Sequence, residues 1–303
     1  FSSRRRHTRF RNVTGVQTCA LPISLPAGRG AVAVAAGATH SLALLDNGDV
    51  YAWGLNETGQ LGTGDLVSKA TPTKVTLPRP AVAVAAGRGF SVAALDDGRV
   101  YTWGTNSIGQ LGDGGRDAQL SPVQVAGLSG IVAVAAGNSH ALALNAAGRV
   151  WAWGANASGQ LGDGRYKASR VPVATPFVEV ARIRAGGDQS AAISRRRALY
   201  LWGENGDGQL GLGTGVDAGV PVAALQGVVE AATADRFTLA LGSDGLARGT
   251  GANETGSLGD GGSTARNTFG AVSTLSDAIS VSAGGRSFSG AVTSSGATFM
   301  WRS

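Results

Sequence analysis

The sequence predicts an all-β chain folded as a β-propeller, and three observations carry this prediction. A Trp-Gly pair recurs at Trp53, Trp103, Trp153 and Trp202, with spacings of 50, 50 and 49 residues. Each pair lies in a unit with the same order of strand-like and turn-like segments, and no helix-length pattern interrupts the units. A repeat length of roughly 20 to 50 residues is typical of solenoids, propellers and other arrays.

The first half of each unit reads as a strand followed by a β-hairpin. Residues 31–36 (AVAVAA) alternate valine with alanine, which favours a strand buried on both faces. Leu42 and Leu44 then share one face of a second strand. The stretch 46–48 (Asp-Asn-Gly) supplies turn residues that tolerate positive φ, and Trp53 lies on the returning strand.

The second half of each unit is a glycine-rich loop and a short fourth strand. The loop N-x-x-G-Q-L-G-x-G spans 56–64, 106–114 and 156–164. The fourth strand contains proline at its start, as in TPTKV (71–75), which suits a strand start or a sheet edge. A four-stranded sheet with indoles on one face and leucines on the other cannot cover both faces, so neighbouring units must sandwich them. We place the units at 31–80, 81–130, 131–179, 180–229, 230–280 and, in part, 281–303; the fifth is degraded and has Thr250 where Trp stood, and the sixth reaches Trp301.

The N-terminal 23 residues are set apart from this pattern. Residues 13–23 (VTGVQTCALPI) resemble a translated sequencing adapter, so we treat 1–23 as a non-native disordered tail and 24–303 as the propeller domain. The tail holds five arginines, no acid and the single cysteine, Cys19. Without it, Lys plus Arg falls from 26 to 21 against 20 acids, so the net charge of +6 falls to +1. Charge then gives no reason to expect nucleic acid or an anionic membrane as a partner.

Several kinds of chemistry are disfavoured by the residues present. His40 and His140 align with Phe90, Gln189, Phe237 and Phe288, and a position that accepts phenylalanine is a packing position. Aspartates in the LGDG segments lack the spacing of a calcium loop, and no Gly-Lys-Ser/Thr phosphate loop or G-x-S-x-G elbow is present. No run approaches the 18 apolar residues of a membrane-spanning helix. We therefore expect no catalytic residue, metal or cofactor, and no membrane insertion.

The segments A-A-G-x-x-H, G-x-V-Y-x-W-G and N-x-x-G-Q-L-G are together similar to the regulator of chromosome condensation repeat, over about residues 31–301. That resemblance implies a seven-bladed propeller that acts mainly in protein recognition. The chain contains five units and a fragment, so we expect a propeller truncated to about five and a half blades. A complete six-bladed variant is the alternative. Strand edges left by an open ring would favour aggregation or dimerisation.

Residues that differ between units are the candidates for partner binding, because scaffold positions must hold the blade while loop positions are free to vary. One set follows the repeated AAG and the other follows QLG, and each set should form a ring of mixed charge on one propeller face. The cluster at 165–167 is the foremost candidate because Tyr and Arg are enriched among interface hot spots, and a solvated loop is the alternative. The native basic run at 195–197 is expected in a solvated hairpin turn. The candidates are Arg88, Asn138, Asp188, Arg236 and Arg286 after AAG, and Arg116, Arg165, Tyr166 and Lys167 after QLG.

Three functions remain open at this stage. The favoured one is a non-catalytic protein-interaction scaffold whose partner the sequence does not identify. The others are a structural spacer in a multi-repeat surface protein and an enzyme with a site on the central face. Members of the family that the chain resembles include a nuclear nucleotide-exchange factor, a plant ultraviolet-B receptor and a secreted bacterial β-lactamase inhibitor. The receptor's GWRHT motif is absent, and of the possible compartments a bacterial secreted or cell-surface location is favoured.

Overall fold

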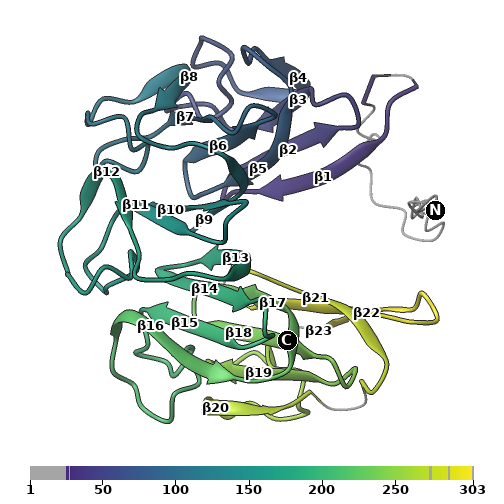
Figure 1. Ribbon diagram of the computed structural model, residues 1–303. Helices are drawn as coiled ribbons and strands as arrows, with labels where there is room; N and C mark the ends of the chain where they lie inside the picture. The colour runs from purple at the N-terminus through teal and green to yellow at the C-terminus, as the bar shows by residue number, and fades with distance from the viewer. Residues whose placement is uncertain (1–24, 27, 273–274, 286, 302–303) are drawn as a thin grey trace, which may run out of the picture.

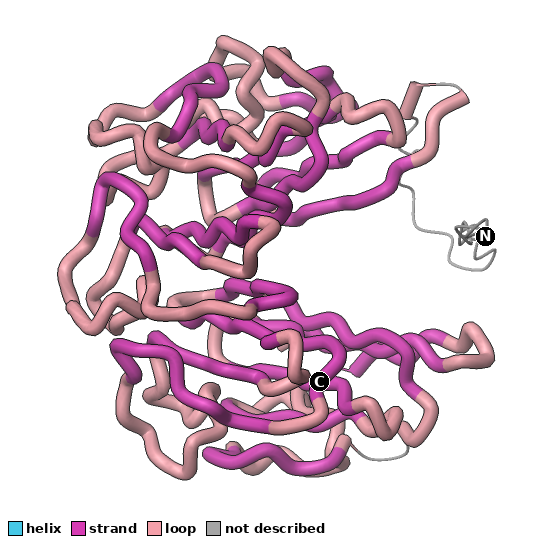
Figure 2. Tube along the Cα trace, in the orientation of Figure 1, coloured by secondary structure: helices cyan, strands magenta, loops and turns pink. Residues whose placement is uncertain are grey.

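The computed structural model describes residues 25–26, 28–272, 275–285 and 287–301 (Figure 1). These residues form six antiparallel sheets and no helix (Figure 2). We call the sheets blades one to six in chain order. The segment 1–23, expected to be a non-native tail, lies outside the described residues.

Five blades have four strands and the sixth has three, and the strands of each blade are neighbours in chain order. Blade one contains β1 (Ala31–Ala36), β2 (His40–Leu45), β3 (Val50–Gly54) and β4 (Lys69–Val75). Blade two contains β5 (Ala81–Ala86), β6 (Phe90–Leu95), β7 (Val100–Gly104) and β8 (Gln119–Val125). Blade three contains β9 (Ile131–Ala136), β10 (His140–Asn145), β11 (Val150–Gly154) and β12 (Ser169–Ala174). Blade four contains β13 (Val180–Gly186), β14 (Gln189–Ser194), β15 (Leu199–Gly203) and β16 (Ala218–Leu225). Blade five contains β17 (Val228–Thr233), β18 (Phe237–Gly242), β19 (Ala247–Gly251) and β20 (Arg266–Ala271). Blade six contains β21 (Ala278–Gly284), β22 (Phe288–Thr293) and β23 (Thr298–Trp301).

The blades follow one another around a common centre, as a propeller requires. The first strands of neighbouring blades contact one another in the series β1, β5, β9, β13, β17 and β21, so they surround the centre. The ring is open, because blades one and six lie on opposite sides of a gap (Figures 1 and 2). The predicted all-β propeller is thus confirmed with six blades. A blade beyond the sixth stays a prediction.

The hydrophobic core lies between blades rather than inside them. At the first junction, Leu42 and Leu44 of blade one pack with Leu95 and Trp103 of blade two. The side chains of Leu42, Leu95 and Trp103 are fully buried. Four more clusters repeat this arrangement at the following junctions. A blade therefore has one face that receives the indole of the next blade, as the alternation of leucine and tryptophan predicts.

Each buried indole also donates a hydrogen bond to the preceding blade. Trp103 Nε1 lies 3.0 Å from the Gln60 carbonyl oxygen. The same bond joins Trp153 to Gln110 at 3.0 Å, Trp202 to Gln160 at 2.9 Å and Trp301 to Ser257 at 2.9 Å. The QLG glycine permits this approach, because a Cβ on Gly162 would lie 2.7 Å from Trp202 Nε1 and its φ is +70°. The Q-L-G motif is therefore a socket for the indole of the next blade.

The socket of blade four is still filled, although blade five has no tryptophan to enter it. Thr250 occupies the tryptophan position, and its hydroxyl donates to the Gly208 carbonyl at 2.9 Å. The ring of Phe269, from the fourth strand, lies over the socket, since a Cβ on Gly211 would be 2.6 Å from that ring. One side chain thus supplies the hydrogen bond and another supplies the aromatic ring.

The prediction of a first strand buried on both faces is wrong at the valine near the start of β5 and of β9. Val82 is 48% exposed and Val132 is 49% exposed, whereas Ala81 and Ile131 are buried. The first strand is the edge strand of its sheet and borders the centre of the ring. Both faces of β5 nevertheless pack on neighbouring blades: Val84 and Ala86 join the cluster shared with blade one, and Ala83 and Ala85 join the cluster shared with blade three.

We expect Trp153→Ala to destabilise the protein by about 3–5 kcal/mol, because it removes a fully buried indole and leaves the Gln110 carbonyl unpaired. Trp53→Ala is the matched control, since Trp53 is only partly buried and makes no such hydrogen bond within the described residues. Urea unfolding followed by circular dichroism measures both variants. Equal losses would contradict the socket as the source of stability.

Candidate functional site

Both sets of variable loops extend from the same end of the blades, where β2-type strands begin and β3-type strands end. His40 pairs with Gly54 in the register of β2 and β3, so the turn 37–39 and the loop 55–68 adjoin each other. The equivalent pairs, such as Phe90 with Gly104 and His140 with Gly154, repeat this geometry. We call the surface formed by these turns and loops the loop face. The hairpin turn that contains Arg195–Arg197 connects β14 and β15 and lies at the opposite end of the blade.

The turns of the loop face are tied together through their backbones. Arg88 N donates to Asn138 O at 3.1 Å, and Asn138 N donates to Gly187 O at 2.7 Å. Asp235 N likewise donates to Gly285 O at 2.9 Å. Neighbouring blades thus hold each other's turns in place, and the side chains are left to vary. The candidate Arg286 lies outside the described residues.

A buried asparagine fixes the backbone of each long loop. In blade three, Asn156 Oδ1 accepts a hydrogen bond from Leu161 N at 2.9 Å. Its Nδ2 donates to Arg165 O at 2.8 Å and to Lys167 O at 3.2 Å, on the other limb of the loop. Asn205 and Asn253 bridge their loops through the same pairs of positions. The repeated Asn-x-x-Gly motif is therefore a loop clamp.

Arg165, Tyr166 and Lys167 project from this clamped backbone. All three side chains are exposed, Tyr166 by 56%. Tyr166 lies beside Gly219 of the next blade, where a Cβ would be 3.0 Å from its hydroxyl oxygen. Arg116 occupies the corresponding loop of blade two and is also exposed. A fixed backbone that presents an exposed Tyr between basic side chains suits an interface anchor.

Arg236 differs from the other candidates because it is engaged within the propeller. Its guanidinium forms two hydrogen bonds with the carboxylate of Asp207 in blade four, from Nε to Oδ2 at 2.7 Å and from Nη2 to Oδ1 at 2.6 Å. It also contacts Glu254 Oε1 at 3.1 Å. These carboxylates, Asp207 foremost, raise the pKa of Arg236. The sequence hypothesis treated Arg236 as a free contact residue, whereas the structure places it in an ion pair between blades four and five.

Carboxylates gather on the loop face at blades four and five. Burial raises the pKa of Asp188, a hydrogen bond from Gln160 opposes this shift, and the nearby Asp235 adds to it. The pKa of Glu204 is also raised, first by burial and then by Asp188 and other aspartates. This part of the loop face is therefore an acidic sector, while the exposed Arg116, Arg165 and Lys167 lie on blades two and three.

Sequence reasoning missed Glu204 and Asp207 as members of this sector. Glu204 stands where the other long loops have Leu55, Thr105 and Ala155, and Asp207 stands where they have Thr58 and Ser158. Comparison of the N-terminal limb of each loop could have found both residues. The proximity of Asp207 to Arg236 could not be found in this way, because it depends on how two blades pack.

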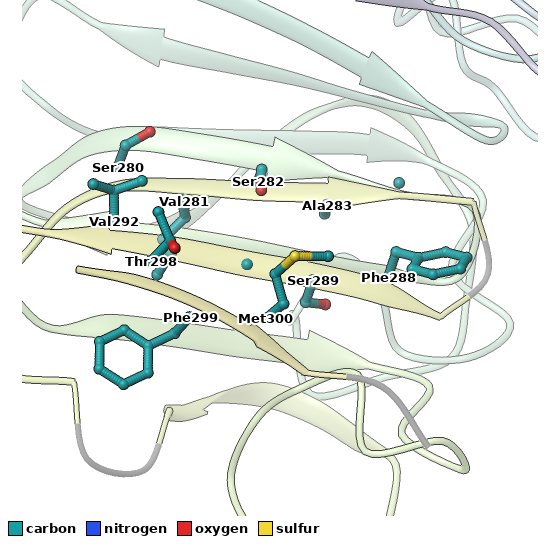
Figure 3. A pocket seen from close by; sticks show the side chains of 13 residues that line it. Ser280, Val281, Ser282, Ala283, Phe288, Ser289, Val292, Thr298, Phe299 and Met300 are labelled. Carbon is teal, nitrogen blue, oxygen red and sulfur yellow. The ribbon is translucent and has the colours of Figure 1, made fainter. Parts of the chain in front are cut away.

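The described residues show no metal centre beside the loop face. No group of three or more His, Cys, Asp or Glu among them could hold a metal ion. His40 and His140 are buried between blades and are not part of the loop face surface. In the described ranges no helix is long and apolar enough to cross a membrane. A hollow of about 540 Å³ lies on the outer face of blade six, where Ser282, Gly290 and Met300 line it (Figure 3).

Comparison with known proteins agrees with the architecture. A family model described as an RCC1-like domain matches residues 8–301. The structure of Prp20p from Saccharomyces cerevisiae is similar with a TM-score of 0.79 and 27% identity, covering 89% of this chain and 71% of that one. The human WBSCR16 structure is similar with a TM-score of 0.77 and 26% identity, covering 87% and 73%.

Curated proteins match only over short segments. The zebrafish (Danio rerio) E3 ubiquitin-protein ligase MYCBP2 is 51% identical over 45 residues, which are 15% of this chain and 1% of that protein. The ultraviolet-B receptor UVR8 of Arabidopsis thaliana is 46% identical over 43 residues, which are 14% of this chain and 10% of that protein. These matches have about the length of a single repeat unit.

We expect Asn156→Ala to lower stability by about 1–3 kcal/mol, because it leaves Leu161 N and two loop carbonyls without their partner. The amide of Leu161 should also exchange hydrogen faster, as measured by exchange with mass spectrometry. Asn47→Ala is the control, since Asn47 forms its hydrogen bonds within an exposed turn at the opposite end of the blade. Unchanged exchange in the loop 157–168 would rule out the clamp.

Proposed function

Because the chain belongs to the RCC1-like domain family, we propose that it is a non-catalytic scaffold that binds a protein partner through the loop face. The observation that carries this proposal is the division of labour in the long loops. Buried asparagines and inter-blade hydrogen bonds hold the backbone, while Arg165, Tyr166 and Lys167 are exposed and form no ion pair among the described residues. A rigid frame lowers the entropy lost when such side chains bind.

Related structures support a protein as the partner. One is of yeast RCC1 (Prp20) with Kap60 bound, and another concerns the binding of Prp20p to Gsp1p and histones. At 26–28% identity, the loop residues of this chain must define its own partner. The separation of the acidic sector from Arg165 and Lys167 of blade three favours a partner with both charges on its contact surface.

Arg165→Glu with Lys167→Glu should weaken partner binding at least tenfold, because both charges lie beside the central Tyr166. A photo-crosslinking residue at position 166 captures the partner, and binding of the purified pair is then measured by calorimetry. Arg196→Glu is the matched control, since Arg196 is exposed at the end of the blade opposite the loop face. Equal loss from Arg196→Glu, or no loss from the loop variant, would refute the loop face as the binding surface.

We also propose that one further sheet occupies the gap in the ring, as in a seven-bladed propeller. Two features support this. β1 is exposed along most of its length, with Val34 75% exposed, whereas Ala81 and Ala85 of β5 are buried. On the far side of the gap, Met300 is 81% exposed beside the hollow of blade six. In the inner junctions the corresponding surfaces are covered by a neighbouring blade.

With these surfaces uncovered, the chain should self-associate as concentration rises. Val34→Lys with Met300→Lys should reduce the dimer fraction measured by sedimentation velocity. Val178→Lys is the control, because Val178 is 60% exposed but lies in the connection between blades three and four. A wild-type protein that stays monomeric at high concentration would count against an uncovered pair of junction surfaces.

A further inference from the structure

Two of the five blade junctions contain a buried histidine that bonds across the junction. His40 Nε2 lies 2.8 Å from Ser91 Oγ of blade two, and His140 Nε2 lies 2.8 Å from Ser190 Oγ of blade four. Each serine hydroxyl in turn donates to the carbonyl of Gln60 or Gln160, at 2.8 Å. Because the hydroxyl hydrogen is used there, the serine oxygen accepts the Nε2–H of the histidine. Nε2 of each imidazole therefore carries a proton.

The other ring nitrogen has no partner. Nδ1 of His40 and Nδ1 of His140 are buried and make no hydrogen bond with the described residues. The backbone of the AAG turn lies against each ring, since a Cβ on Gly37 or Gly137 would be 2.7 Å from Nδ1. A second proton would therefore put an N–H and a positive charge where no acceptor is present. Such a group carries a large desolvation penalty.

No charged group stands close enough to offset that penalty. Burial alone lowers the pKa of His40 and of His140, each to about 4. Around His40, ionisable side chains lie on β3, on the turn 87–89 and on the loop 55–68. Around His140, they lie on β13, at position 188 and on the loop 155–168. None hydrogen-bonds either imidazole or contributes to its pKa; these groups are Tyr51, Glu57, Asp65, Arg88, Asp163, Arg165, Tyr166, Lys167, Arg182, Arg184 and Asp188.

The remaining junctions use pairs that do not titrate. Phe90 takes the histidine position at the second junction, and Ala141 takes the serine position opposite it. At the fourth junction Thr238 Oγ1 donates to Gln189 Oε1 at 2.9 Å. At the fifth junction the pair is Phe237 with Ser289, whose hydroxyl donates to Ser257 O. Histidine thus occurs only opposite a serine, and phenylalanine and glutamine provide acid-insensitive alternatives in the same fold.

We propose that the propeller has two acid-sensitive junctions, between blades one and two and between blades three and four, which loosen when His40 and His140 take up a second proton. The other three junctions stay closed. In the unfolded chain a histidine titrates near 6.5, above its value in the folded protein. Unfolded chains therefore bind more protons between these values, and stability that is complete above pH 6.5 is lost as the pH falls toward 4.

The consequence extends to the loop face. The carbonyls of Gln60 and Gln160 that accept the serine hydroxyls also accept the indoles of Trp103 and Trp202. A charged histidine would therefore disturb the socket of its junction as well as its own hydrogen bond. These sockets lie within the long loops of blades one and three, at residues 60–62 and 160–162.

The test copies the chain's own insensitive pairs into the sensitive junctions. His40→Phe with Ser91→Ala, and His140→Phe with Ser190→Ala, reproduce the Phe90 and Ala141 pair. The unfolding equilibrium constant is measured in urea at pH 7, 5.5 and 4. On going from pH 7 to pH 4 it should rise in the wild type by about a hundredfold more per histidine than in the corresponding variant. An equal pH dependence in the wild type and both variants would overturn the proposal.

A second measurement does not rely on those variants folding. Hydrogen exchange in the wild type at pH 4.5, corrected for intrinsic rates and compared with pH 7, should show loss of protection in β6 and β14 and not in β18, which packs only in the fourth and fifth junctions. Loss of protection in all three strands, or in none, would refute the assignment. His40→Gln with Ser91→Thr, which copies Gln189 and Thr238, should restore protection of β6 at pH 4.5, and failure to do so in the folded variant would equally count against it.

Discussion

The structure depends on one repeated contact between neighbouring blades, in which an indole enters the Q-L-G loop of the preceding blade and donates to its carbonyl. The indole buries a large apolar surface, and its one polar group finds an acceptor there. A single sheet offers neither the apolar cover nor the acceptor. The array is therefore stable only as an array, because each blade completes the core of its neighbour.

The fifth blade shows which parts of this contact are essential. Its tryptophan position holds Thr250, whose hydroxyl bonds to Gly208 of blade four, one residue before the Gln209 that corresponds to Gln160, and the aromatic cover comes from Phe269 on another strand. The requirement is thus for a donor and a ring at defined places, and the residue that supplies them can change. The same reasoning applies to the position of His40, where histidine, phenylalanine and glutamine each find a matching residue across the junction.

A frame held in this way separates stability from recognition. The carbonyls and buried amides that fix the long loops belong to repeated residues, such as Asn156 and Gln160. The residues that vary, such as Tyr166 and Arg165, have exposed side chains, and Arg165 joins the frame through its backbone carbonyl. Arg236 is the exception, since its charge joins two blades and is already neutralised by Asp207 and Glu254. Variability alone therefore does not identify a binding residue.

The sequence by itself determined the propeller, the order of strands and the identity of the packing residues, because spacing, alternation and turn chemistry are local properties that repeat. It also placed the variable residues in loops. Only the tertiary structure decided that both loop sets share one face, that Arg236 pairs with Asp207 and that Val82 and Val132 are exposed. The shared face follows from strand register, as in the pairing of His40 with Gly54. The ion pair follows from packing between blades, where residues 29 positions apart meet. The unpartnered Nδ1 of each buried histidine has the same origin, since its surroundings come from two blades and no single repeat encodes them.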